Sequence, residues 1–307
     1  MTGTNRAQCV VVHNPVSGDA QHADTVRDRA AIRGYEVTET AEAGDAIAMA
    51  REAAADGASV VVAAGGDGTI NEVVRGIDRA DALDRVTLGV IPTGTGNNFA
   101  GNIGIPSVED GFSVLENGER RRIDLGRAGD RPFVNSCVGG LTAEASAETS
   151  ADMKTRLGTL AYAITTLRTA RDFDGLRLTI DLGEDDGRTG TWEGEAICVL
   201  VGNGRRFSPG EDSQANMEDG RFEVTIIEEM PATDMMEAAL VERLTGGDVE
   251  RVTNLRTAAL EIDADAPEPI SFSLDGEMVD SQALSLSTEP SALGVLVGPD
   301  YDTDPDR

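Results

Sequence analysis

The chain has 307 residues, and its 55 acidic side chains outnumber its 26 basic ones, so the net charge is −29 at pH 7. This charge, without a stripe of lysines or arginines, argues against a nucleic-acid partner, because nothing would neutralise the phosphates. Hydrophobic residues make up 40% of the chain, enough for packed cores in about two domains of roughly 150 residues each.

The acidic residues are scattered through the chain, and Lys154 is the single lysine among the 26 basic residues. Two explanations compete: a cationic partner, and adaptation to very high salt. At about 1 M salt the Debye length falls to about 3 Å, so dispersed carboxylates no longer repel one another. The near-absence of lysine favours the second, halophilic explanation.

The first 125 residues alternate between strand and helix patterns. Strands are predicted at 8–12, 35–39, 58–64 and 87–91, and helices at about 20–33, 44–56, 69–77 and 107–116. The strands are apolar without polar alternation, which is typical of a parallel sheet covered by helices. We therefore predict an α/β domain over residues 1–126, with its ligand outside the carboxyl ends of the strands.

From about residue 127 the pattern changes to short strands with acidic turns such as GEDDG (183–187). Strands are predicted at 175–182, 191–201, 221–228, 256–263, 270–275 and 283–287, with one helix at about 153–170. This pattern predicts a second, β-rich domain over residues 127–290. The C-terminal segment 291–307 ends in GPDYDTDPDR, which predicts a disordered acidic tail.

Cysteine usage and hydropathy indicate a cytoplasmic protein, at most peripheral to a membrane. Cys9, Cys137 and Cys198 lie far apart in apolar runs, as expected of reduced core residues, and His13 and His22 form no metal spacing with them. No apolar stretch approaches the length of a membrane span, and no signal peptide precedes Cys9.

Three glycine-rich turns follow predicted strands of the first domain: NPVSG (Asn14–Gly18), GGDGT (Gly65–Thr69) and PTGTGNN (Pro92–Asn98). Glycines allow positive φ and let a ligand approach the peptide N–H groups closely. Thr69 followed by Glu72 matches a capping box, which predicts a helix N-terminus, suited to phosphate, at Thr69. Together the turns predict a ligand site.

Asp67 is an unusual residue for a phosphate site, because a carboxylate repels phosphate unless a cation lies between them. The chain lacks the G-x-x-x-x-G-K-[ST] motif whose lysine would supply that cation. Mg²⁺ prefers carboxylate and phosphate oxygens together. We therefore expect Asp67 to meet a nucleotide phosphate through Mg²⁺ or water.

In this order and spacing, NPVSG, GGDGTINEVV and IPTGTGNNFA resemble the diacylglycerol kinase catalytic domain family, especially its prokaryotic lipid kinases. The resemblance continues in RIDLG (122–126), KTRLGTLAYAI (154–164), VGNGRRFSPG (201–210), NMEDGRFEV (216–224) and SLDGEMV (273–279). GGDGT alone is shared with NAD kinases and phosphofructokinases, but the full series is specific. The resemblance implies a three-layer α/β nucleotide domain, a β-rich sandwich-like domain, and an active site between them.

The resemblance also implies site residues. Those implied for ATP are Asn14, Pro15, Val16, Ser17, Gly18, Thr40, Gly65, Gly66, Asp67, Gly68, Thr69, Ile70, Asn71 and Thr95. Those implied for a metal are Asn216, Asp219 and Arg221, of which only Asp219 offers a carboxylate and its neighbours would offer main-chain oxygens. Asp124 is implied to be linked to the same network. Glu277 matches the general base that takes the proton from the acceptor hydroxyl. Asp275 stands two residues before it, so in an extended strand the two would share a face. Asp275 and Asp67 are expected to be catalytic together with Glu277.

Two residues leave questions open at this stage. The family commonly has Asn-Asp where this chain has Asn97 and Asn98, and loss of that carboxylate can weaken a polar link or alter metal handling. Lys154 opens the predicted helix of the second domain, and it is equally well explained as a contact to phosphate or lipid headgroup and as an ordinary surface residue.

These features predict an ATP- and Mg²⁺-dependent lipid kinase that transfers the γ-phosphoryl group to a lipid hydroxyl. Two alternatives stay open: an NAD-kinase-like enzyme with a soluble hydroxyl substrate, and a non-catalytic nucleotide or lipid sensor. The predicted partner is a lipid substrate reached by peripheral membrane contact through hydrophobic or salt-tolerant loops, since polybasic attraction is not available. A homodimer and the identity of the lipid are left open.

Overall fold

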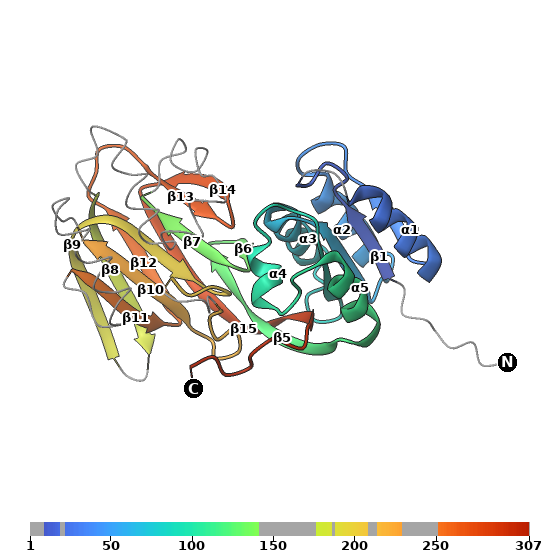
Figure 1. Cartoon of the computed structure of the whole chain (residues 1–307). Helices are drawn as coiled ribbons and strands as arrows, with labels where there is room; N and C mark the ends of the chain where they lie inside the picture. The colour runs from blue at the N-terminus through green and yellow to red at the C-terminus, as the bar shows by residue number, and fades with distance from the viewer. Residues whose placement is uncertain are drawn as a thin grey trace.

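The computed structural model describes residues 9–18, 22–140, 176–185, 188–207, 214–228 and 251–306. These residues form an α/β domain and a β-rich domain that are joined side by side (Figure 1). The helix expected at 153–170, Lys154 within it, and part of the acidic turn at 183–187 lie outside the described residues.

The α/β domain contains a parallel sheet with the strand order β4-β3-β1-β2. The strands are β1 (Cys9–His13), β2 (Glu36–Glu39), β3 (Val60–Gly65) and β4 (Thr87–Pro92). The main helices are α1 (Ala23–Arg33), α2 (Asp45–Ala55), α3 (Asp67–Arg79) and α5 (Val108–Asn117). These elements confirm the α/β prediction, and a short helix that was not predicted, α4 (Asn98–Asn102), is added after the third glycine turn.

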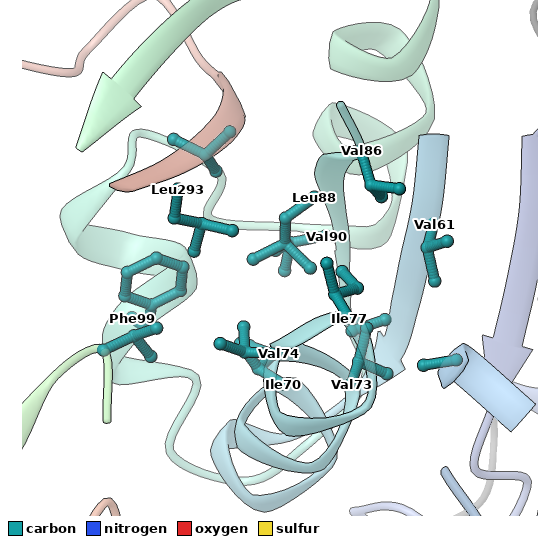
Figure 2. Packing of buried hydrophobic residues seen from close by; sticks show 14 of the residues in the cluster. Val61, Ile70, Val73, Val74, Ile77, Val86, Leu88, Val90, Phe99 and Leu293 are labelled. Carbon is teal, nitrogen blue, oxygen red and sulfur yellow. The ribbon is translucent and has the colours of Figure 1, made fainter. Parts of the chain in front are cut away.

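Alternating strand residues feed two separate cores, one on each face of this sheet. Val61 and Leu88 pack with Ile70 and Ile77 of α3 (Figure 2). Val62 points the other way and packs with α1 and α5. Burial on both faces explains why the strands are apolar throughout, and it makes this domain a three-layer structure.

The β-rich domain is built from antiparallel strands, as predicted. They are β5 (Glu119–Ala128), β6 (Arg131–Phe133), β7 (Ser136–Gly139), β8 (Leu176–Asp185), β9 (Arg188–Gly202), β10 (Phe222–Glu228), β11 (Val252–Thr257), β12 (Ala259–Ala264), β13 (Ile270–Leu274), β14 (Glu277–Ser281) and β15 (Ala283–Val297). Strands β5, β6, β7 and β14 were not predicted, and the single strand expected at 256–263 is two strands. Phe133 and Phe222 stack in its core with ring centroids 5.7 Å apart.

Strand β15 runs through both domains and holds them together. Its first half pairs with β12, and near its end Gly294 and Val295 pair in parallel with β4. An irregularity at Ser291, which has a φ of 50°, separates the two halves. Because β5 pairs along both halves, a single sheet continues from the β-rich domain into the α/β domain.

The prediction of a disordered acidic tail is wrong for residues 298–306. Gly298 N–H donates to the carbonyl of Ile103 at 2.8 Å, and the Tyr301 hydroxyl donates to Glu218 at 2.9 Å. Asp306 forms an ion pair with Arg256 at 2.8 Å. The tail is ordered because its tyrosine packs against the α/β core and its acidic groups meet arginines of the β-rich domain.

Cys137 and Cys198 are buried, Cys9 is half-buried, and all three are free thiols, as expected. Burial raises the pKa of Cys9 to about 11 and that of Cys198 to about 12. Within the described residues, no helix combines the length and apolar character that crossing a membrane requires.

Candidate active site

The three glycine-rich turns meet at the carboxyl ends of β1, β3 and β4, and their backbones touch. A Cβ on Gly94 would lie 2.4 Å from Cα of Gly66, and one on Gly18 would lie 2.4 Å from the Thr93 carbonyl oxygen. Gly18 also has a φ of 63°. These glycines are required by backbone packing between the turns, whereas a Cβ on Gly68 would meet nothing within 4 Å.

Helix α3 begins at Asp67 with Gly66 as its N-cap, so the capping box predicted at Thr69 is wrong. Thr69 lies buried in the first turn of α3, where its hydroxyl accepts a hydrogen bond from Asn14 Nδ2 at 3.4 Å. Glu72 instead accepts from the N–H of Gly44, the N-cap of α2, at 3.0 Å. No side chain caps the α3 N-terminus. Its first amides are therefore placed to bind an anion.

Asp67 caps the neighbouring helix α4. Its carboxylate accepts hydrogen bonds from the backbone N–H of Asn98 at 3.1 Å and of Phe99 at 2.9 Å, and from Asn98 Nδ2 at 3.3 Å. A carboxylate at position 98 could not donate this third bond and would repel Asp67. Asn98 thus strengthens the link between the second and third glycine turns in this chain.

A cation that the sequence reasoning missed lies close to Asp67. Arg205 follows β9, and its positive charge interacts with Asp67. Burial lowers the pKa of Arg205, and Asp67 acts in the opposite direction. The arginine belongs to VGNGRRFSPG, so its position within a family-like motif was the available signal.

One face of α3 connects the glycine turns to the β-rich domain. Asp67, Asn71 and Arg75 are four residues apart and therefore lie on the same side of the helix. Asn71 Nδ2 donates to Asp275 at 3.0 Å, and Arg75 Nη1 donates to Glu277 at 2.5 Å. The candidate site therefore lies between the domains, along α3 and the β13–β14 hairpin (Figure 1).

Asp275 lies in the turn of this hairpin and not in a strand. Asp275 and Gly276 have φ values of 48° and 93° between the paired residues Leu274 and Glu277, as in a two-residue type I′ turn. The prediction that Asp275 and Glu277 share a strand face is therefore wrong, because the chain reverses between them.

The Asp275 carboxylate is filled by hydrogen bonds. It accepts from Asn71 and from three consecutive backbone N–H groups, those of Val134 at 2.7 Å, Asn135 at 2.9 Å and Ser136 at 2.8 Å. Burial raises the pKa of Asp275, while these hydrogen bonds oppose the rise. With all its acceptor directions used, Asp275 positions the hairpin and has no free oxygen for a substrate.

Glu277 is the accessible carboxylate of the hairpin, with 47% of its side chain exposed. Arg75 and Arg131 bind its two oxygens at 2.5 and 2.7 Å. Sequence reasoning missed both arginines. Arg75 could have been found from its helical spacing with Asp67 and Asn71, but no local pattern relates Arg131 to Glu277.

The carboxylates among the residues implied for a metal accept backbone hydrogen bonds. The buried Asp124 carboxylate accepts from the N–H groups of Gly220 at 2.6 Å and Ser291 at 2.8 Å. Asp219 is paired with Arg256 and accepts from the Arg221 N–H at 3.0 Å. The described part of the chain contains no group of three or more His, Cys, Asp or Glu placed to hold a metal.

Asn216, implied for a metal, and several residues implied for ATP differ in how far they are exposed. Asn216 Oδ1 accepts from the N–H of Glu218 at 3.1 Å and so shapes its own turn. The side chain of Ile70 is fully buried in the core of the α/β domain (Figure 2). Val16 and Thr95 are exposed on the first and third glycine turns, where a ligand could reach them.

Other residues implied for ATP form the glycine turns, and Thr40 follows the neighbouring strand β2. Asn14 Oδ1 accepts from the N–H of Val16 at 3.2 Å, and Thr40 N–H donates to the carbonyl of His13 at 2.9 Å. Pro15 and Ser17 are half-buried in the first turn. A Cβ on Gly65 would lie 2.3 Å from Oγ1 of Thr69, so a side chain there would clash with α3.

Comparison with known proteins matches both domains to families. Residues 8–128 match the family described as "Diacylglycerol kinase catalytic domain". Residues 135–297 match the "YegS C-terminal NAD kinase beta sandwich-like domain". A crystal structure of a diacylglycerol kinase from Bacillus anthracis str. Sterne has the same fold, with a TM-score of 0.74 and 22% identity, over 98% of this chain and 100% of that one.

Curated relatives agree with these matches. The protein named "Probable lipid kinase YegS-like" from Pseudomonas aeruginosa is 32% identical over 293 residues, which cover 93% of this chain and 92% of the relative. "Lipid kinase YegS" from Escherichia coli K12 is 32% identical over 265 residues, which cover 85% of each chain. The chain therefore belongs to the diacylglycerol kinase catalytic domain family, in its YegS-like group of lipid kinases, and it is a kinase.

Proposed function

We propose that this kinase transfers the γ-phosphoryl group of ATP to a hydroxyl group of a lipid. The observation that carries the proposal is the polar face of α3, which begins at uncapped amides beside the glycine turns and continues to the hairpin that bears Glu277. In this proposal, one helix binds the donor phosphate at its N-terminus and positions the proton acceptor, Glu277, through Arg75.

In this proposal the donor phosphates bind at the N-terminus of α3, where the amides of Gly68 and Thr69 have no capping side chain. Arg205, from the β-rich domain, adds positive charge beside Asp67. Phosphoryl transfer depends mainly on positioning and on neutralisation of the phosphate charge. Both requirements are met here by groups from two domains.

Glu277 is proposed as the general base for the acceptor hydroxyl. It is exposed and held by Arg75 and Arg131, so its carboxylate has a defined position. A base of this kind contributes roughly 10²–10⁴-fold to the rate. Asn71 donates a hydrogen bond to Asp275 in the turn of the hairpin, so these two residues are proposed to hold the hairpin, and with it Glu277, in place.

Magnesium stays a prediction. Bound to the triphosphate, it would neutralise phosphate charge. The carboxylates of Asp124 and Asp219 accept backbone hydrogen bonds, and that of Asp67 accepts three hydrogen bonds. The main-chain oxygens of Asn216 and Arg221 stay predicted ligands. The roles of Gly68, Thr69 and Glu277 above do not depend on it.

The test uses the purified protein in molar KCl with radiolabelled ATP and either a total lipid extract or NAD. Labelled lipid supports the proposal, labelled NAD supports a kinase of a soluble substrate, and ATP binding without any labelled product supports a sensor. Glu277→Gln should keep its affinity for ATP and lose at least about 100-fold in turnover. Glu36→Gln, at an exposed position on β2, is the matched control.

We also propose that the substrate is reached by peripheral contact with a membrane. Flotation of the protein with liposomes at high salt measures this contact, and no flotation at any salt concentration would contradict it. The acidic surface makes attraction to anionic lipid through basic clusters an unsuitable mechanism.

A further inference from the structure

The end of the chain forms a strap between the two domains. Strand β15 ends at Val297 in the α/β domain, and residues 298–306, which we call the C-terminal strap, run from there back to the β-rich domain (Figure 1). The two family matches cover residues 8–128 and 135–297, so neither of them includes the strap. The contacts of the strap are therefore a feature of this chain that the family domains do not account for.

The first fastening of the strap to the β-rich domain is at Gln214. The N–H of Asp302 donates to Gln214 Oε1 at 3.1 Å, and Gln214 Nε2 donates back to the carbonyl of Asp302. Gln214 is buried, and its backbone forms an antiparallel β-bridge with Arg205. A single side chain therefore connects the backbone of the strap to the segment that carries Arg205.

The second fastening is an ion-pair cluster at Arg206. Asp306 pairs with Arg206 and with Arg256, the latter at 2.8 Å. Glu223 pairs with the same two arginines, at 3.4 Å and 3.2 Å. Of these two carboxylates, Asp306 is the one that the strap supplies. The strap thus holds Arg206 by charge and Gln214 by hydrogen bonds.

Fixing Arg206 also determines where Arg205 points. Consecutive residues of an extended segment point to opposite sides, so an arginine held toward the strap directs its neighbour away from the strap. The guanidinium of Arg205 lies over the ring of Phe207, 5.3 Å from its centroid, and its charge interacts with Asp67 at the start of α3. The strap therefore lies behind the segment whose other side faces the donor end of α3.

We propose that the C-terminal strap is a positioning element of the donor site, which holds Arg205 where its guanidinium binds the phosphates of ATP. The proposal rests on the proposed function above. A guanidinium group binds phosphate oxygens through charge-assisted hydrogen bonds whose strength depends on its orientation. Without the strap, Arg205 keeps its charge but loses its fixed position. The affinity for ATP then falls, because binding must also order the arginine.

The experiment measures equilibrium binding of ATP and of adenosine to the full chain in molar KCl, without an acceptor. Asp306→Arg sets a third cation against Arg206 and Arg256, and it should weaken ATP binding about tenfold, within the range of couplings between linked sites. Affinity for adenosine, which has no phosphate, should stay within about twofold of the wild type. Asp306→Glu should bind ATP as the wild type does, because it keeps the charge.

Asp300→Arg is the matched control, because Asp300 is an exposed residue of the same strap and the change in charge is the same. Added positive charge by itself favours an anion, so Asp300→Arg should not weaken ATP binding. Thermal unfolding checks that each variant is folded. If Asp306→Arg does not fold, Asp306→Asn takes its place, with an expected loss of about threefold, because a partly exposed ion pair contributes modestly.

A double-mutant cycle tests whether the strap acts through Arg205. In an Arg205→Gln background, Asp306→Arg should change ATP affinity by less than about twofold, because the group that the strap positions is absent. An equal loss of ATP affinity with and without Arg205, or equal losses for ATP and adenosine, would overturn the proposal. Unchanged ATP affinity in both Asp306→Arg and Asp306→Asn would overturn it as well.

The same measurements keep this proposal separate from the proposed function. Strap-dependent binding of ATP by a protein that phosphorylates no lipid would contradict the lipid kinase activity alone. Phosphorylated lipid together with ATP binding that does not depend on Asp306 would contradict the role of the strap alone. A wild-type protein that binds no ATP would contradict both.

Discussion

Replacing Asp275 by asparagine tests whether its carboxylate holds the hairpin that bears Glu277. One oxygen of Asp275 accepts from Asn135 and Ser136, and the other accepts from Val134 and Asn71. An asparagine keeps one oxygen, so its NH₂ group must face one of these two pairs of donors. Two hydrogen bonds are therefore lost, and the N–H groups of the asparagine amide face the N–H groups that donated them.

The expected loss of stability follows from these contacts. Hydrogen bonds to a charged acceptor contribute about 1.5–3 kcal/mol each, so two are worth about 3–6 kcal/mol. Burial, which raises the pKa of Asp275, disfavours the carboxylate, and asparagine relieves that penalty. The lower end, about 3 kcal/mol, is therefore expected, equivalent to a fall of about 5 °C in Tm for a chain of 307 residues.

The assay combines thermal unfolding with kinetics in molar KCl. Turnover should fall in Asp275→Asn while the Kd for ATP stays near that of the wild type, because the glycine turns are not touched. Asp263→Asn, on the exposed face of β12, is the control. The double variant Asn71→Asp, Asp275→Asn should not restore stability, because the backbone donors of residues 134–136 still face an amide. Full rescue by the exchange, or a loss under 1 kcal/mol, would refute the reasoning.

Two further predictions concern the α/β domain. Asn98→Asp should lower the free energy of unfolding by about 1–2 kcal/mol, because the Asn98 side chain stops donating to Asp67 and a like charge is added; denaturant titration measures this, and an unchanged midpoint would contradict it. Burial lowers the pKa of His13, with Glu39 acting in the opposite direction, so the unfolded chain binds its proton at higher pH than the folded chain. Stability should thus rise as pH increases through the range below about 6.5, and His13→Gln should flatten this slope in urea titrations; the same slope in both proteins would rule His13 out.

Local patterns in the sequence were enough to predict the α/β domain and the three glycine turns at one edge of its sheet. Apolar strands followed by NPVSG, GGDGT and PTGTGNN predict glycine turns at one sheet edge, and the turns meet there. Such patterns depend on neighbours within a few residues. They could not predict the short helix α4, and they located the start of α3 two residues too late.

The tertiary structure alone decided which partners the functional side chains have. Asn71 and Asp275 are 204 residues apart, and Arg75 and Glu277 are 202 apart, so no local pattern relates them. No local pattern predicts the order of the tail either. Its acidic sequence predicts disorder, but Tyr301 and Asp306 contact Glu218 and Arg256, which lie far away in the sequence. The sequence by itself determined the secondary structure and the turns, because these depend on short-range chemistry. The fold decided the environment of each carboxylate. Asp275 accepts four hydrogen bonds from N–H groups and Glu277 is exposed, and this difference comes only from the residues packed around them.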